Sequence, residues 1–286
     1  MQIIDFIFGL VAFICKNLLN LFVKFNKVLK INYYSSKTEK SNCDIMWDTA
    51  KDYRILIAMH ARELFLRTVQ TGSFRGNWNK KATIEETKKM EADLKSLLYC
   101  YLEGDALANC EDVEKLEDKA GKIIEFLGGE DWAHKFMNGA PKDEREKTEE
   151  NIAKVRFFLD TILGLRNRFK FGPIDDPIIG IDVKVGEIMS VSKHPKADSL
   201  MICNVNLGKR ALKVVTNDLT VKEGNRVGVS LLPPATFMDI VSEGMFLGMN
   251  GSILKEVQGE LGNMPNGIPI ESLNETKNMI TNFLDS

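Results

Sequence analysis

The strongest constraint on the fold is a change in hydrophobic spacing near residue 172. Before it, apolar residues recur every three or four positions, as on one face of an amphipathic helix. After Gly172-Pro173 and Asp176-Pro177, apolar and polar residues alternate, which is typical of half-buried strands. The sequence therefore predicts an α+β multidomain protein, with an N-terminal helical bundle followed by a β domain.

Five helices are expected before the switch, because each apolar run is bounded by residues that start or stop helices. A glycine follows each of the first three runs, and Thr83 with Glu86 has the spacing of a capping box. Pro141 opens the last run, where its missing N–H costs nothing. Short links favour an antiparallel bundle. The predicted helices span residues 47–71, 83–103, 111–127, 130–138 and 141–169.

Five short strands are expected after the switch, because glycine-containing turns separate the alternating runs. Two of these turns lie at residues 206–209 and 222–225. Short strands joined in this way are typical of a small barrel or sandwich. The predicted strands cover residues 181–188, 200–205, 212–215, 227–231 and 243–247.

The first 45 residues fit neither pattern. The apolar run 6–15 has ten residues, whereas a membrane-spanning helix needs roughly 20, and a small-residue cleavage site of a signal peptide is missing. Residues 16–31 mix apolar residues with lysines, as in a basic helix on a membrane surface. Three interpretations stay open: a dispensable extension from the choice of start site, a membrane-associated segment, or a core helix.

Composition argues against several classes of site. The net charge of −2 predicts no bulk attraction to polyanions, so nucleic-acid binding would need a local basic patch. The five cysteines are scattered without a C-x-x-C pair, which indicates reduced thiols in a cytoplasmic protein. The sequence has no phosphate-binding loop, nucleophile elbow or metal-ligand cluster. We therefore predict no catalytic residues, no metal and no cofactor.

The β part carries several motifs in a defined order. Residues 185–188 (VGEI) lead into 193–200 (KHPKADSL), followed by 221–227 (VKEGNRV) and 242–245 (SEGM). Together they resemble the tRNA-binding domain family over residues 177–250. That family includes C-terminal domains of some methionyl-tRNA synthetases, a domain of the phenylalanyl-tRNA synthetase β-subunit and free-standing tRNA-binding proteins.

The resemblance implies a five-stranded OB-fold barrel that grips tRNA by shape through basic loops. Residues 184–226 hold eight basic and four acidic residues, whereas residues 238–286 hold two and seven, so the positive charge is local. Binding through that charge would depend strongly on salt. Phe237 and Phe246 are the only aromatic residues between 177 and 250, so we expect base stacking to be a minor term. The candidate tRNA-binding residues are Lys184, Lys193, Lys196, Ser199, Lys209, Arg210, Asn217, Arg226, Ser242 and Met245.

Two neighbours of these residues are expected to shape the backbone. We expect His194, before Pro195, to form the turn rather than to contact RNA, and Gly244 to let another segment approach closely. The role of the helices is less constrained. The aromatic segment 74–78 is either a docking surface, for a synthetase or a second copy of the chain, or part of the core.

The predicted organisation is an extension (1–45), a helical bundle (46–172) and a tRNA-binding OB-fold domain with a C-terminal extension (173–286). The leading functional hypothesis is a non-catalytic tRNA-binding protein that serves as an accessory factor to an aminoacyl-tRNA synthetase. The alternative is a dimeric, chaperone-like OB-fold protein that binds polypeptide.

Overall fold

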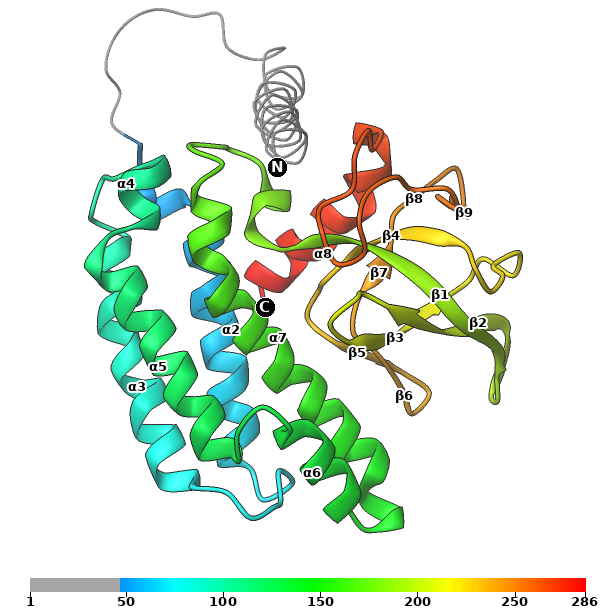
Figure 1. Cartoon of the computed structure of the whole chain (residues 1–286), viewed down its shortest axis with the longest axis horizontal. Coiled ribbons are helices and arrows are strands. Elements are labelled where there is room, and N and C mark those ends of the chain that lie inside the picture. The colour runs from blue at the N-terminus through cyan, green and yellow to red at the C-terminus, as the bar shows by residue number, and fades with distance from the viewer. Residues whose placement is uncertain (1–46) are drawn as a thin grey trace, which may run out of the picture. The chain divides into compact units, whose positions relative to one another are not determined.

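The computed structural model describes residues 47–286, and these residues belong to one compact unit (Figure 1). The predictions for residues 1–45, including membrane association, lie outside the described residues. Within the described part, no helix combines the length and the hydropathy that crossing a membrane requires.

Helices make up the described chain as far as residue 169, apart from the loops that join them. The prediction for 111–127 is met residue for residue, and Gly128 ends that helix in the left-handed conformation, at φ 117°. Pro141 precedes a 3-10 turn (Lys142–Glu144) rather than the last helix itself. The helices are α2 (Tyr53–Gln70), α3 (Lys80–Leu97), α4 (Gly104–Ala108), α5 (Glu111–Leu127), α6 (Trp132–Gly139) and α7 (Arg145–Phe169).

The capping box predicted at Thr83 is wrong. Asn79 caps α3 instead, because its side-chain oxygen accepts a hydrogen bond from the Ala82 amide at 3.1 Å. Thr83 lies within the helix and is fully buried. The residues around it in the sequence do not indicate this burial. The helix also ends earlier than predicted, at Leu97. Its last turn is held by Thr49, whose hydroxyl donates to the Leu98 carbonyl at 2.9 Å.

Aromatic rings form much of the helical core. Phe65 of α2 stacks on Phe158 of α7, with 4.3 Å between ring centroids. Phe74 stacks on Phe136 at 4.4 Å, and Trp78 meets the edge of Phe74. Phe74 is only 3% exposed. Phe74 is therefore part of the core, and Trp78 packs half-buried against it, so the two aromatic rings give no support to a docking surface there.

The β part is an antiparallel sheet in the order β3-β2-β1-β4-β7, so the predicted α+β organisation, with helices first and strands after, is confirmed. Alternate residues such as Cys203, Val205 and Val214 are buried against each other on its inner side. Two short hairpins, β5–β6 and β8–β9, were not predicted. The strands are β1 (Val183–His194), β2 (Ala197–Asn206), β3 (Ala211–Thr216), β4 (Arg226–Ser230), β5 (Ala235–Phe237), β6 (Ile240–Ser242), β7 (Met245–Phe246), β8 (Gly248–Met249) and β9 (Ser252–Ile253).

The predicted closed barrel is not seen in the strand pairing of the described residues. β3 and β7 end the order and do not pair as strands. The edge of β3 bonds instead to the segment just before β7: the Glu243 amide donates to the Lys213 carbonyl at 2.8 Å, and the Val215 amide donates to Ser242 Oγ at 3.0 Å. One backbone hydrogen bond and one hydrogen bond to a side chain are therefore found where strand pairing between β3 and β7 would close the barrel.

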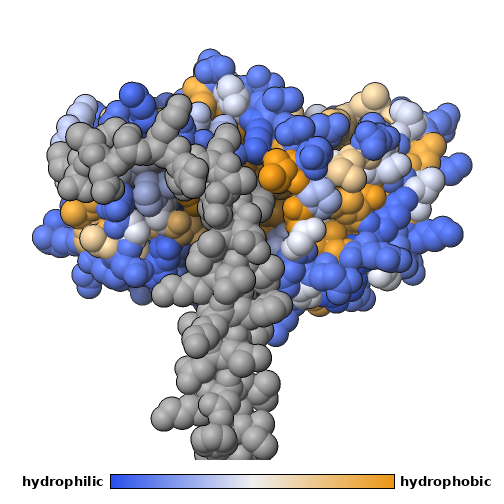
Figure 2. All heavy atoms as spheres, turned by 90° about the horizontal axis from the view of Figure 1, so that it is seen from above, coloured by the Kyte–Doolittle hydropathy of each residue, from blue (hydrophilic) through white to orange (hydrophobic). Residues whose placement is uncertain are grey.

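The C-terminal residues form a helix, α8 (Asn274–Leu284), that fastens the two parts together. Phe283 places its ring 5.6 Å from His60 of α2 and 5.8 Å from Phe157 of α7, between centroids. On the sheet side, the Thr276 hydroxyl lies 2.9 Å from that of Ser230 on β4. Among the coloured residues visible in Figure 2, most are hydrophilic, and apolar residues lie in groups between them.

Candidate nucleic-acid interface

Four of the predicted residues lie at one end of the sheet. Met201 of β2 pairs with Lys193 of β1 on one side and with Thr216 of β3 on the other. Ser199 and Asn217 therefore fall at the same end as Lys193. Lys196 lies in the turn between β1 and β2 at this end, and all four side chains are exposed. The register brings together a set that is spread over 25 positions of the sequence.

His194 joins this end of the sheet to the β5–β6 hairpin. It is 3% exposed, and its Nε2 lies 2.9 Å from the Phe237 carbonyl oxygen. A carbonyl only accepts, so Nε2 carries the proton, and Nδ1 accepts from the Lys196 amide at 3.1 Å. The imidazole therefore shapes the β1–β2 turn, as expected from the sequence, and also bonds to a strand 43 residues away.

The tip of the β5–β6 hairpin is apolar and exposed. Phe237 is 41% exposed and Met238 55% exposed. Met238 and Asp239 have φ angles of 45° and 75°, so the turn uses left-handed backbone at both positions, which matches strand twist. Asp239 forms an ion pair with Lys196. The hydrogen bond and the charge of Asp239 raise the pKa of Lys196.

We call this region the hairpin-tip surface; it consists of Lys193, Lys196, Ser199, Asn217, Phe237 and Met238. Neither Phe237 nor Met238 is among the residues that the sequence predicts to bind tRNA. The sequence contains one local indication of this tip. An apolar pair directly before Asp239, between two short alternating runs, is typical of a hairpin turn.

Asp218 anchors the loop that carries Asn217. Its carboxylate accepts from the Thr220 amide at 2.8 Å and from the Ile253 amide of β9 at 3.0 Å, and it lies 3.3 Å from Lys255 Nζ. Burial alone would raise its pKa, but these hydrogen bonds outweigh burial and lower the pKa of Asp218 to about 2. The buried carboxylate is therefore a structural brace of the hairpin-tip surface.

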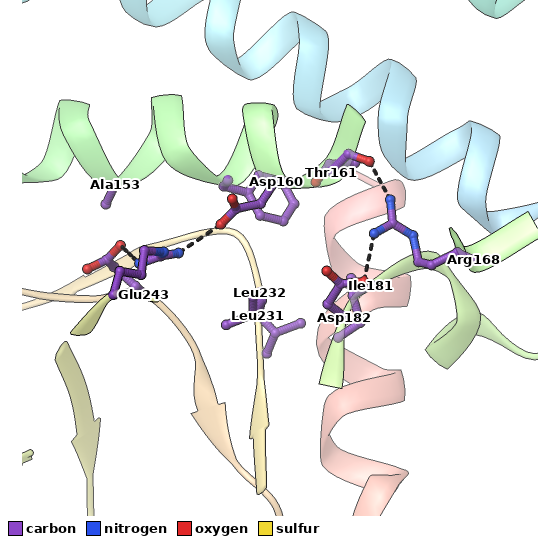
Figure 3. A pocket seen from close by; sticks show the side chains of 11 residues that line it. Ala153, Asp160, Thr161, Arg168, Ile181, Asp182, Leu231, Leu232 and Glu243 are labelled. Carbon is purple, nitrogen blue, oxygen red and sulfur yellow. Dashed lines mark hydrogen bonds and ion pairs between the residues drawn. The ribbon is translucent and has the colours of Figure 1, made fainter. Parts of the chain in front are cut away.

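Other predicted residues face α7 instead of open solvent. Arg210 bonds to Asp160 of α7 at 2.8 Å and to Glu243 at 3.0 Å, around the cavity shown in Figure 3. Burial lowers the pKa of Arg210, but the two carboxylates outweigh burial and raise it. Lys213, a neighbour on β3, pairs with Glu149 of α7 at 2.5 Å. These cations are already neutralised by the helical part.

The same cavity holds a second ion pair between the two parts. Arg168 of α7 donates to Asp182 at 2.8 Å, and these side chains point toward each other in Figure 3. Burial would raise the pKa of Asp182, but the charges of Arg168 and Lys184 lower it. The buried Nε of Arg168 has no hydrogen-bond partner among the described residues.

Ser242 and Met245 are also taken up by internal contacts. Ser242 is 4% exposed and donates to the Gly244 carbonyl at 2.9 Å, in addition to its bond from β3. Met245 is half-buried against the helical core. A Cβ on Gly244 would lie 2.5 Å from the Ser230 carbonyl oxygen, so the predicted close approach is confirmed. This motif therefore holds the sheet edge against the helices.

Three predicted residues lie toward the opposite end of the sheet. Lys184 is nine positions before Lys193 on β1, up to about 30 Å away in an extended strand. It lies 3.6 Å from Asp182. Arg226 donates to the Gly259 carbonyl and lies 3.9 Å from Glu187. Lys209 is exposed in the β2–β3 turn. The ten candidates thus do not form one continuous patch.

Two family models match the chain. Residues 46–172 match a family described as "Alpha helical domain", and residues 183–270, which contain the whole sheet and the hairpin-tip surface, match one described as "Putative tRNA binding domain". Over residues 183–270 the β part therefore matches the tRNA-binding domain family. The resemblance noted in the motifs is therefore confirmed.

In each relative, the segment that matches this chain is a small part of the protein. The phenylalanine–tRNA ligase beta subunit of Moorella thermoacetica is 41% identical over 87 residues, which cover 25% of this chain and 11% of the relative. The cytoplasmic methionine–tRNA ligase of Arabidopsis thaliana is 34% identical over 79 residues, covering 25% and 10%. The "Putative tRNA-binding protein YtpR" of Bacillus subtilis is 41% identical over 46 residues, covering 16% and 23%. The chain thus spans a quarter or less of these relatives.

Proposed function

We propose that this protein binds tRNA and that the hairpin-tip surface makes the contact. The observation that carries the proposal is the meeting of Lys193, Lys196, Ser199 and Asn217, all exposed, at one end of a domain of the tRNA-binding family. Lysine ammonium groups suit phosphate oxygens, and serine and asparagine side chains hydrogen-bond to phosphate or sugar.

The charge distribution supports binding by this surface rather than by the whole barrel. A net charge of −2 leaves no general attraction for RNA, so a few local cations must supply it. Arg210 and Lys213 are held by carboxylates of α7, whereas Lys193 is exposed at the tip. Each phosphate contact adds roughly 0.7 to 0.9 to the slope of log K against log salt. A binding slope of only a few units is expected.

We also propose the finer architecture. The sheet is an OB-fold variant in which Ser242 and Glu243 bridge the seam between β3 and β7, with domains at 46–172 and 173–286. The protein acts without catalysis as an accessory factor that presents tRNA to a synthetase, and the helical domain docks that partner. The free thiols of Cys100, Cys110 and Cys203 fit a reducing, cytoplasmic compartment.

A tRNA titration at several salt concentrations tests the function. We expect measurable binding by the full chain, and a loss of about tenfold or more in the Lys193→Ala/Lys196→Ala variant, with a slope lower by about 1 to 2. The matched control is Lys81→Ala/Lys88→Ala, which removes two exposed charges from α3. No binding by the wild-type chain at low salt would contradict the proposal, as would equal losses in the two variants.

A further inference from the structure

Exposed apolar side chains at the β5–β6 tip call for a binding partner. Phe237 and Phe246 are the two aromatic residues of the region, and the structure separates them: Phe246 is 4% exposed in the core, whereas Phe237 is 41% exposed. Met238 beside it is 55% exposed. An isolated apolar residue on a surface is ordinary, but these two are adjacent and lie on the hairpin that bonds to His194 and Lys196.

Contacts with the end of β1 hold the tip of the β5–β6 hairpin in place. The Phe237 carbonyl accepts a hydrogen bond from His194 Nε2, and Phe237 also pairs with Ile240 across the ladder. These contacts fix the backbone that presents the ring at a set position relative to Lys193 and Lys196. A platform held in this way loses little conformational entropy on binding.

We propose that Phe237 and Met238 form a stacking platform for unpaired bases, while Lys193 and Lys196 bind the phosphates that flank those bases. This inference rests on the proposed RNA-binding function and adds the class of RNA: strands with unpaired nucleotides, such as loops or ends. In a continuous duplex the bases are already stacked inside the helix and cannot reach the ring. His194 is a positioning residue that holds the platform beside the lysines.

The charges around the tip fit a nucleic-acid ligand. Asp239 neutralises Lys196 in the free protein, and a phosphate can replace that carboxylate as the partner of the ammonium group. Glu146 near the start of α7 also acts on Lys196 through its charge. A strand whose phosphates bind these lysines therefore lies next to the hairpin that carries the exposed Phe237 ring.

The experiment compares a stem-loop RNA with a blunt duplex of the same length, titrated against the full chain. Stacking on an aromatic side chain contributes about 1–3 kcal/mol per base, so Phe237→Ala should weaken stem-loop binding by about fivefold or more. Its salt slope should match that of wild type, because stacking neutralises no phosphate. Phe237→Tyr should keep the affinity and Phe237→Leu should lose it. Binding of the duplex should not change.

Leu163→Ala is the matched control, because Leu163 lies on α7 and is 40% exposed. His194→Ala should weaken the stem-loop in the same direction as Phe237→Ala while retaining the far-ultraviolet circular dichroism spectrum. If Phe237→Ala binds the stem-loop as tightly as wild type does, the platform is wrong. Equal weakening for stem-loop and duplex would also overturn it. If wild type binds neither RNA nor tRNA, the proposed function fails instead, so the two failures are distinguishable.

Discussion

Two groups of basic residues in the sheet part look alike in the sequence and have different surroundings in the structure. Lys193 and Lys196 lie at the exposed tip, and among residues 47–286 the only carboxylate bonded to either is Asp239, from the same sheet part. Arg210 and Lys213 lie 14 and 17 positions after Lys196, and carboxylates of α7 bind both. The comparison shows that a positive charge alone does not make a residue available to RNA. The opposite charges that contact the residue in the folded protein decide whether it is available.

The helical part supplies these opposing charges along one helix. Glu149 and Asp160 are 11 positions apart on α7, which is close to three full turns, so they lie on the same face. That face meets Lys213 and Arg210. The ion pairs therefore orient the helical domain on the sheet, whereas the tip is left for a ligand. The predictions below test this division of roles.

The largest effect on folding is expected for Glu243→Gln. The Glu243 side chain is 12% exposed and meets Arg210 at 3.0 Å and Arg156 at 3.5 Å. Its loss leaves two arginines short of a carboxylate, which should lower the free energy of unfolding by about 3 kcal/mol. Urea denaturation measures this. Glu223→Gln, exposed in the β3–β4 connection, is the control and should change it by less than about 0.5 kcal/mol. If Glu243→Gln and Glu223→Gln unfolded at the same urea concentration, the contacts of Glu243 with Arg210 and Arg156 would not be stabilising.

Asp218→Asn should cost somewhat less, and its cost should depend on pH. The folded pKa of Asp218, about 2, lies below its ordinary value of 3.8, so its ionised form stabilises the folded state. The linkage amounts to about 2 kcal/mol, present above pH 4 and lost as the pH falls toward 2. Denaturant unfolding of both chains at pH 7, 4 and 3 should show the difference shrinking. A constant difference would contradict the assigned role of this carboxylate.

The smallest effect is expected for Asp239→Asn, and it has the opposite sign. Removing the carboxylate frees Lys196 for phosphate, so tRNA affinity should rise by about two- to threefold at low salt. Fluorescence anisotropy with labelled tRNA measures the change. Asp198→Asn, exposed on β2 with the same loss of charge, separates a specific effect from a general one. If both variants bind equally tightly, Asp239 has no special relation to Lys196.

The sequence was most informative where the determinants of structure are local. The helix 111–127 was predicted without error because its apolar spacing and its terminal Gly128 both lie within the segment. The start of α3 was missed because Asn79 and Thr83 are both good caps, and only packing buries Thr83. The helix α8 was not predicted, since its fixed position depends on His60 and Phe157, far earlier in the chain.

The candidate site shows the same limit. Lys193, Lys196, Ser199 and Asn217 were selected from motifs and come together because the strand register aligns them. Arg210 was selected on the same grounds, but its partner Asp160 is 50 positions away and belongs to the other part of the chain. Nothing near Arg210 in the sequence indicates that carboxylate. Contacts between distant segments therefore decide which basic residues remain free for RNA.

The most direct test of the central claim is a parallel tRNA titration of two variants that lose the same charge at different places. Lys193→Ala/Lys196→Ala removes two cations from the tip, and Arg210→Ala/Lys213→Ala removes two from the α7 side, each used under conditions where circular dichroism shows it folded. We expect the first variant to lose about tenfold or more in affinity, while the second stays within about twofold of wild type. An equal loss in both, or a larger loss in the second, would contradict the assignment of RNA binding to the hairpin-tip surface.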